Sequence, residues 1–237
     1  KDTPGIRYRT PELIEQELLY LKNEYGVQGV NLMDEIGIPL NRKAAIRHLE
    51  ALGRSNIIWR GQCRVDGITP ELAILSKQSG CVALGLGVES VNQLSLDIIN
   101  KNIQIEQAKT TILTIKKAGI ETRLYMIIGL PAEPEDIVEK TWSFIQETQP
   151  DLVYLSHLTI RPGTEMYNHP DKFGIESVDT NWEKTMHMHG RFGEETPVPT
   201  FKYKEQTPWG KSIPPETIML NYMELQRRLR ENGLSSL

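Results

Sequence analysis

The sequence predicts an α/β fold in which parallel strands are joined by helices. Helical and strand patterns alternate five times along the chain, in units of roughly 25 to 35 residues, which favours parallel pairing with helical crossovers. Polar side chains stand directly after the predicted strands, where sites form in such folds. The 237 residues can bury about 72% of the surface of the unfolded chain, enough for a core without disulfides or metals.

Thr-Pro pairs begin two helices in the first half of the chain. Thr10-Pro11 and Thr69-Pro70 each place a capping hydroxyl before a proline that fits the first helical turn. Apolar residues follow at helical spacing, and we expect Gly26, Gly53 and Gly80 to end the helices. The predicted order is helix 10–25, strand 27–33, helix 41–52, strand 56–65, helix 69–79 and strand 81–88.

The second half of the chain continues the alternation and then loses it. Apolar stripes predict helices at 91–99, 105–118 and 133–148, with strands at 121–128 and 152–160. Residues 168–213 are rich in Pro, Gly, His and Thr and show no clear period, whereas 214–231 is amphipathic and predicts a last helix.

Charge and cysteine content exclude several classes of protein. A net charge of −4 disfavours a broad nucleic-acid face, and no apolar run is long enough to span a membrane. Two cysteines are too few for a secreted disulfide framework, so we expect a cytoplasmic protein whose Cys63 and Cys81 are small core residues.

Three polar groups are candidates for chemistry, each with a plainer alternative. Asp34-Glu35 could bind a metal, an ammonium group or a hydroxyl, or could simply solvate the start of a helix. Glu89-Ser90 could offer a carboxylate to hydroxyls or an amine, or could form a capped turn between strand and helix. The preceding glycines do not predict a dinucleotide site, because a glutamate stands where the third glycine of GxGxxG belongs.

The remaining candidates are weaker. Arg64 and Asp66 lie on one side of an extended segment and could form an internal ion pair or line a pocket. His187 and His189 share a face if extended, but without a neighbouring cysteine or an HExxH pattern we predict an exposed loop and no metal site.

An ordered set of motifs resembles the radical S-adenosylmethionine (SAM) superfamily, and most closely the group often fused to a cobalamin-binding domain. The resemblance covers about residues 7–168. Its segments are Tyr8-Arg9, Val30–Glu35, Trp59–Asp66, Gly80–Ser90, Asn100-Lys101, Ile128–Pro131, Glu133 and Arg161–Thr164.

This resemblance implies a partial TIM-like barrel with SAM across the carboxyl ends of the strands. A [4Fe–4S] cluster on CxxxCxxC then reduces SAM to a 5′-deoxyadenosyl radical that abstracts hydrogen from substrate. This chain has no CxxxCxxC. We therefore expect the first strand and the cluster loop to precede Lys1 in a longer protein, and this chain alone to assemble no cluster and to be inactive.

The family also implies roles for individual residues. Asp34 and Glu35 match the acidic pair that holds the amino group of SAM, and Lys101 matches a basic position facing its carboxylate. The other matching positions are Glu89 and Ser90 for polar parts of the cofactor, Ile128 and Gly129 for backbone beside adenine, and Arg64 for the pocket lining.

We therefore predict a barrel at 1–168, a C-terminal extension at 169–237, and the catalytic core of a radical SAM enzyme whose expected partner is a small-molecule substrate of unknown identity. Cobalamin is a candidate further cofactor, and the open barrel edge is a candidate dimer contact. One alternative is a barrel without catalysis that serves as a binding module. Another is an ordinary TIM-barrel lyase that uses Asp34 and Glu89.

Overall fold

The computed structural model describes residues 8–34, 36–181 and 199–235. Five strands form one sheet in chain order, β1-β2-β3-β4-β5, and the pairings of β1 with β2 and of β2 with β3 are parallel. The predicted fold class, a partial TIM-like barrel of parallel strands, is confirmed. The chain divides into two compact units, residues 1–87 with 106–123 and residues 88–105 with 124–237.

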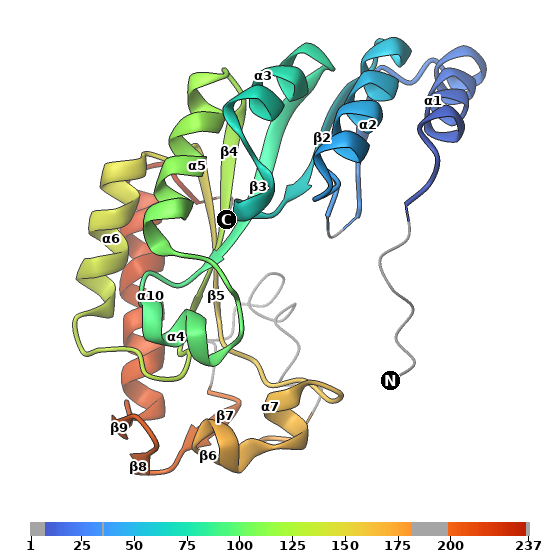
Figure 1. The fold of residues 1–237 in the computed structure, drawn as a ribbon. Coiled ribbons are helices and arrows are strands. Elements are labelled where there is room, and N and C mark those ends of the chain that lie inside the picture. Colours follow the sequence, from blue (N-terminus) through green and yellow to red (C-terminus); the bar gives the residue numbers. More distant parts are fainter. Residues whose placement is uncertain (1–7, 35, 182–198, 236–237) are drawn as a thin grey trace. The chain divides into compact units, whose positions relative to one another are not determined.

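The first unit holds the beginning of the sheet and four helices (Figure 1). The capping hydroxyls of Thr10 and Thr69 accept hydrogen bonds from backbone N–H groups three residues later, as the Thr-Pro pattern predicts. The elements that lie wholly or mostly in this unit are α1 (Pro11–Tyr25), β1 (Gly29–Asn31), α2 (Arg42–Ser55), β2 (Ile58–Cys63), a 3₁₀ turn η1 (Val65–Gly67), α3 (Pro70–Gln78), β3 (Cys81–Glu89) and α5 (Ile105–Lys117).

Helix α2 continues past Gly53, so the prediction that this glycine ends the helix is wrong. The helix ends at Ser55, and Asn56 takes the left-handed conformation with φ of 49°. Gly53 instead allows a close approach, because a Cβ atom there would lie 3.4 Å from the Cα of Ser79, just after α3. The buried Trp59 of β2 also reaches Ser79, since its indole N–H donates to the Ser79 carbonyl over 3.0 Å.

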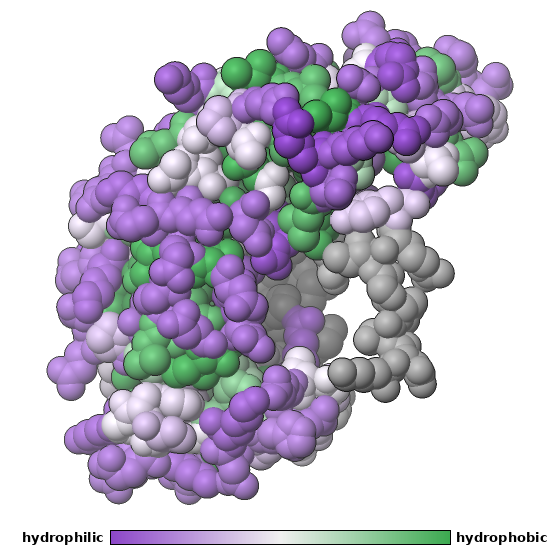
Figure 2. All heavy atoms as spheres, in the orientation of Figure 1, coloured by the Kyte–Doolittle hydropathy of each residue, from purple (hydrophilic) through white to green (hydrophobic). Residues whose placement is uncertain are grey.

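The second unit contains the end of the sheet and the C-terminal elements. Alternate residues of β4 are buried, and α6 buries one stripe, while hydrophilic side chains predominate over α6 on the face shown in Figure 2. The elements are α4 (Gln93–Ile98), β4 (Glu121–Ile128), α6 (Ile137–Thr148), β5 (Leu152–His157), α7 (Glu165–Asn168), η2 (Pro170–Phe173), β6 (Ile175–Val178), β7 (Phe201–Tyr203), β8 (Gln206–Thr207), β9 (Gly210–Lys211) and α10 (Pro215–Glu231).

The C-terminal segment packs along β5. Helix α10 contacts β5 and α6, and the Gln226 amide donates to the Leu155 carbonyl over 3.2 Å. Beyond the helix, the Val153 N–H donates to the Leu234 carbonyl over 2.8 Å. Backbone of the last described turn therefore satisfies part of the outer edge of β5.

Helix α6 begins four residues later than the sequence predicts. Residues 131–136 form a turn in which Ala132 has φ of 62°, and Glu133 is buried in this turn. The buried carboxylate accepts a hydrogen bond from the Gly129 N–H, so Glu133 serves the loop after β4 and not the helix. Within the described residues, no helix is long and apolar enough to cross a membrane.

Candidate cofactor-binding site

The predicted site residues follow the carboxyl ends of strands. Asp34 comes three residues after β1, Arg64 directly follows β2, Glu89 is the last residue of β3 and Gly129 directly follows β4. Each of the first four strands thus has one predicted position at its carboxyl end, which is where parallel α/β folds place their sites.

In the first unit, the structure places Arg64 in an ion pair. Its guanidinium donates two hydrogen bonds of 2.8 Å to the carboxylate of Asp66, and these bonds raise the pKa of Arg64. The ion-pair alternative is therefore confirmed, and the fork of Arg64 is already engaged. Asp34 is exposed, and Glu35 lies outside the described residues, so the cofactor roles of all three stay predictions.

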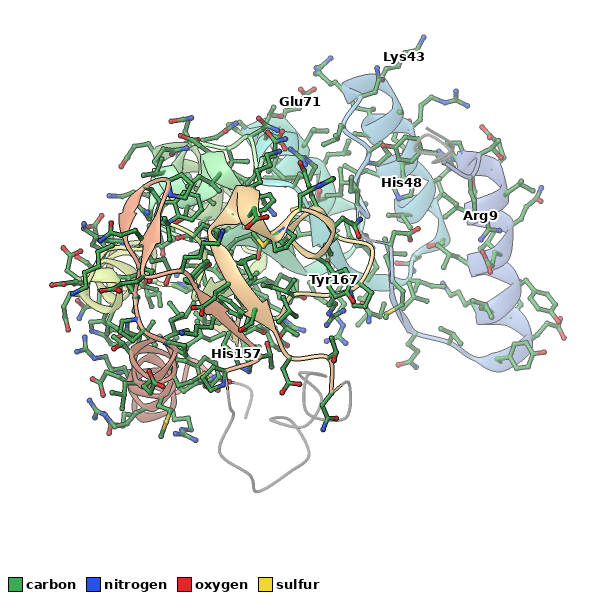
Figure 3. The ribbon with its side chains drawn as sticks, turned by 90° about the horizontal axis from the view of Figure 1, so that it is seen from below. Arg9, Lys43, His48, Glu71, His157 and Tyr167 are labelled. Carbon is green, nitrogen blue, oxygen red and sulfur yellow. The ribbon has the colours of Figure 1, made fainter. Side chains whose placement is uncertain are left out.

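Figure 3 shows His48 on α2, and the structure adds an electrostatic link to Asp34 that the sequence did not predict. Burial lowers the pKa of His48, and the charge of Asp34 opposes this effect. The Nε2 atom of His48 is buried without a hydrogen-bond partner among the described residues. A largely neutral imidazole therefore lies within the electrostatic range of the Asp34 carboxylate.

In the second unit, the structure brings Glu89 and Lys101 together. The Lys101 ammonium donates to the Glu89 carboxylate over 2.7 Å, and their side chains are only 27% and 19% exposed respectively. Glu89 itself has φ of 67°, a left-handed conformation that is uncommon for a residue with a side chain. Strained backbone of this kind persists where the surroundings enforce it, and it is frequent at functional sites.

The loop that carries Lys101 is shaped by two asparagines. Asn100 and Asn102 both take the left-handed conformation, with φ of 60° and 55°. Asparagine tolerates this conformation better than most residues. The Lys101 N–H donates to the Leu96 carbonyl over 2.9 Å, which returns the chain to the end of α4. The left-handed backbone on either side of Lys101 and this hydrogen bond thus place the lysine so that its side chain reaches the end of β3.

Ser90 fulfils the plainer of its two interpretations. Its side chain is buried, and its hydroxyl accepts a hydrogen bond from the Asn92 N–H over 3.1 Å. The Asn92 amide then donates to the Ala132 carbonyl over 2.7 Å, and the Ser95 hydroxyl donates to the Pro131 carbonyl over 2.6 Å. The capped turn after β3 is therefore tied to the loop after β4, and direct contact of Ser90 with a cofactor stays a prediction.

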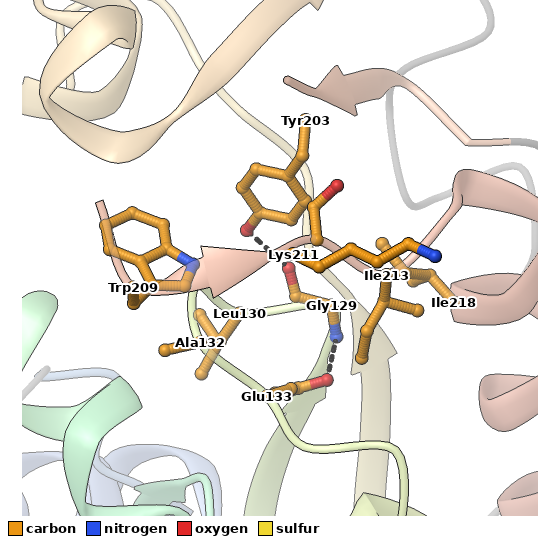
Figure 4. A pocket seen from close by; sticks show the side chains of 10 residues that line it. Gly129, Leu130, Ala132, Glu133, Tyr203, Trp209, Lys211, Ile213 and Ile218 are labelled. Carbon is orange, nitrogen blue, oxygen red and sulfur yellow. Dashed lines mark hydrogen bonds between the residues drawn. The ribbon is translucent and has the colours of Figure 1, made fainter. Parts of the chain in front are cut away.

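The loop after β4 is held at both backbone polar groups of Gly129 (Figure 4). The Gly129 N–H donates to Glu133 over 2.8 Å, and the Gly129 carbonyl accepts from the Tyr203 hydroxyl over 2.8 Å. Gly129 has φ of 95°, and a Cβ atom there would lie 2.8 Å from Cγ2 of Ile218. Both its conformation and its neighbour therefore require glycine.

Ile128 offers less to a ligand than its place in the motif implies. Its side chain is 1% exposed, and its carbonyl accepts a hydrogen bond from the Leu158 N–H over 2.8 Å. Because these polar groups of Ile128 and Gly129 already have partners, the main contribution of this backbone to a bound ring would be van der Waals contact.

A small cavity of ≈ 20 Å³ lies beside this loop, enough for one water molecule. Glu133 lines it, and its Oε1 atom is buried without a hydrogen-bond partner in the described part of the chain. Burial raises the pKa of Glu133 to about 8, although hydrogen bonds from the backbone at Gly129 and Leu130 oppose this effect. The sequence signalled Glu133 only as part of the Gly129 motif, and nothing in it signalled Tyr203.

The two cysteines do not fit an iron–sulfur cluster. Both are buried, and burial raises the pKa of both thiols, that of Cys81 to about 12. A cluster with one open iron takes three thiolates, and the chain contains two cysteines. Among the described residues, no group of three or more His, Cys, Asp and Glu side chains could hold a metal ion, and His187 and His189 lie outside them.

The charges of the second unit do fit the amino-acid end of SAM. That end carries an ammonium group and a carboxylate, and the Glu89–Lys101 pair supplies the opposite charges side by side. Because the pair is largely buried, its charges are screened less than an exposed pair would be. The donor set therefore matches the ligand that the motifs imply.

Comparisons with known proteins agree with the motifs. The model of the "Radical SAM superfamily" matches residues 1–145. An uncharacterized methyltransferase of Pyrococcus horikoshii is 29% identical over 76% of this chain and 40% of its own length. An anaerobic magnesium-protoporphyrin IX monomethyl ester cyclase of Cereibacter sphaeroides is 30% identical over 68% of this chain and 27% of its own length.

A solved structure shares the fold. The radical SAM methyltransferase TsrM of Kitasatospora setae, with cobalamin and a [4Fe–4S] cluster bound, aligns with a TM-score of 0.60 at 18% identity. The alignment covers 67% of this chain and 33% of TsrM. This chain thus spans less than half the length of the relatives described, and the resemblance drawn from the motifs is confirmed.

Proposed function

We propose that this chain, which belongs to the radical SAM superfamily, forms the SAM-binding core of a longer enzyme that cleaves SAM. The Glu89–Lys101 pair at the carboxyl end of β3 is the single observation that carries the proposal. The pair combines a strained glutamate with a lysine aligned to it by two left-handed asparagines. Strained backbone of this kind is frequent at functional sites.

Glu89 and Lys101 would bind the amino-acid end of SAM. The Glu89 carboxylate would accept hydrogen bonds from the ammonium group, and the Lys101 ammonium would donate to the carboxylate. On binding, the ion pair between Glu89 and Lys101 would weaken, and each side chain would form a new hydrogen bond to SAM. Because a lysine is a point charge and not a fork, the geometry at the carboxylate would be less restrictive than with an arginine.

The other matched residues would complete the contacts. The backbone of Ile128 and Gly129 would lie beside the adenine ring, and Asp34 and Glu35 would contribute acidic groups near the ligand. Arg64 would act through its bond to Asp66, since its guanidinium is engaged there. These assignments rest on the order of the family motifs in the sequence.

In the superfamily, a [4Fe–4S] cluster supplies the electron that cleaves SAM. The two cysteines of this chain do not fit that cluster, so its thiolates would come from the longer protein. The chain's own contribution would be to bind SAM, to orient it and to exclude water from it. A cobalamin group is a further expected cofactor, supported by its presence in the TsrM structure.

We propose a flat conjugated ring as the substrate class. The cyclase relative is named for a porphyrin, and a second TsrM structure holds tryptophan. Tyr125 and Tyr154 support this class, because their rings stack 5.2 Å apart, at 18° to each other, on half-buried positions of β4 and β5. Stacked aromatic side chains present a surface to which another flat ring can bind.

The proposal is tested by SAM binding to the whole protein. Glu89→Gln and Lys101→Met should each weaken binding by about 10- to 150-fold, as expected when a charged hydrogen bond worth about 1.5–3 kcal/mol is lost. Glu135→Gln and Lys140→Met make the same chemical changes at exposed positions of the same unit and should leave affinity unchanged.

Products of the anaerobic reaction with a strong reductant distinguish the alternatives. Formation of 5′-deoxyadenosine or of S-adenosylhomocysteine by the whole protein supports the enzyme. SAM binding without either product would favour a binding module, and unchanged affinity in both site variants would refute the proposed contacts.

A further inference from the structure

The backbone N–H and the backbone carbonyl of Gly129, which belong to two successive peptide groups, both make hydrogen bonds. Its N–H donates to Glu133, four residues ahead, and its carbonyl accepts from Tyr203, which is 74 residues ahead. Both bonds are 2.8 Å long. A local contact and a distant one therefore hold the two successive peptide groups that meet at the Cα atom of Gly129, as Figure 4 shows.

The distant contact is made in a buried environment. Tyr203 is 6% exposed and Glu133 is 8% exposed, so neither can exchange its bond for water at low cost. Burial and the nearby Glu133 charge raise the pKa of Tyr203 well above its usual value, so the phenol stays a donor at every pH near neutrality. The hydroxyl thus remains bonded to the Gly129 carbonyl under working conditions.

A third contact comes from the last helix. Ile218 of α10 occupies the space that a side chain at position 129 would need, 2.8 Å from the Cβ position. Tyr203 and Ile218 both belong to the C-terminal part of the chain, outside the residues 1–145 that the superfamily model matches. The loop after β4 is thus contacted by a part of this protein that lies outside the region matched by the superfamily model.

We propose that Tyr203 is a positioning residue that holds the Gly129 loop in place for the adenine end of SAM. The inference rests on the proposed function, because it assumes that this loop lies beside the adenine. It adds a role for the C-terminal segment, which would set the affinity for SAM without touching it. Glu133 bonds to the Gly129 N–H, which belongs to the peptide group before the Cα atom, whereas the Gly129 carbonyl, which belongs to the peptide group after it, is held by Tyr203.

The test is Tyr203→Phe in the whole protein, with Tyr25→Phe as the matched control. Both variants lose one phenolic hydroxyl, but Tyr25 is 68% exposed. Loss of the Gly129 bond should weaken SAM binding by about 2- to 10-fold. In the active enzyme, KM for SAM should rise by that factor while kcat stays unchanged, whereas a general loss of folded protein would lower kcat and leave KM alone.

Hydrogen exchange provides a second measurement that needs no ligand. Backbone amides of residues 128–130 should exchange faster in Tyr203→Phe than in the parent, while those of α2 should not change. In the parent protein, the free energy of local opening measured by hydrogen exchange should be the same for segments 128–131 and 200–204. This comparison needs no variant, so it tests the inference even if Tyr203→Phe folds poorly. Independent opening of the two segments would overturn it.

The outcomes separate this inference from the proposed function. A parent protein that binds SAM and a Tyr203→Phe variant that binds it equally well would refute the role of Tyr203 alone. A parent protein that binds no SAM would refute the proposed function, and with it the link to affinity. Weaker binding together with faster exchange at 128–130 supports the inference.

Discussion

Replacing Glu133 with glutamine should change how the stability of the protein depends on pH. The carboxyl is buried, and its pKa is raised from an ordinary 4.5 to about 8. The folded protein therefore keeps its proton over a range in which the unfolded chain has lost it. This group stabilises the fold fully below pH 4.5, and the stabilisation is lost as pH rises through 8.

The size of the effect follows from the two pKa values. At about 1.4 kcal/mol for each pH unit, the interval from 4.5 to about 8 gives a ceiling of about 5 kcal/mol. Glutamine has the shape of the neutral acid and can still accept from the Gly129 N–H, but it does not titrate. The variant should therefore resemble the parent near pH 5 and exceed it in stability near pH 9.

Urea unfolding at pH 5, 6, 7, 8 and 9 measures the difference between the two proteins. The free energy of unfolding of the parent is subtracted from that of the variant at each pH. Titrating groups that the substitution does not affect contribute equally to both proteins and cancel. Glu135→Gln removes an exposed carboxyl two residues away and should give a curve parallel to that of the parent. A difference between parent and Glu133→Gln that stays constant from pH 5 to pH 9 would refute the reasoning.

Three further outcomes are expected. Gly129→Ala should destabilise the fold by about 1–3 kcal/mol in urea, because alanine is strained at φ of 95° and its Cβ meets Ile218; stability equal to the parent would contradict this. Thr69→Ala should cost about 1 kcal/mol through loss of the cap on α3, whereas Thr69→Ser should retain most of it. The 237-residue chain alone, with Cys63 and Cys81 as its only cysteines, should form no 5′-deoxyadenosine when incubated anaerobically with iron, sulfide, a reductant and SAM, and detection of that product would refute the cluster argument.

Elements with a clear period were predictable from the sequence. Strand β4 lies at the predicted residues 121–128, since alternation of buried and half-buried positions continues through its whole length. Helix α1 begins at Pro11 as predicted, because its cap is encoded in adjacent residues. Helix α6 begins later than predicted, because Glu133 belongs to the turn before it. The side chain of Glu133 accepts a hydrogen bond from the Gly129 N–H, and the spacing of apolar residues gives no sign of this bond.

The site was predictable only in part. The order of motifs pointed to Glu89 and Lys101, but their mutual bond depends on the left-handed backbone at Glu89, Asn100 and Asn102. Tyr203 lies in a stretch without periodicity, 74 residues from its partner Gly129. Contacts of that range are set by tertiary packing, which leaves no local pattern in the sequence.

The bond between Val153 and Leu234 has a practical consequence for anyone who produces this protein. An open strand edge is a template on which other chains can polymerise, and here the backbone beyond α10 occupies one donor of that edge. Deleting residues from 233 onward would leave α10 in place but uncover β5. Such a shortened protein should be more prone to form insoluble material on expression, so any shortened form of the protein should retain Leu234.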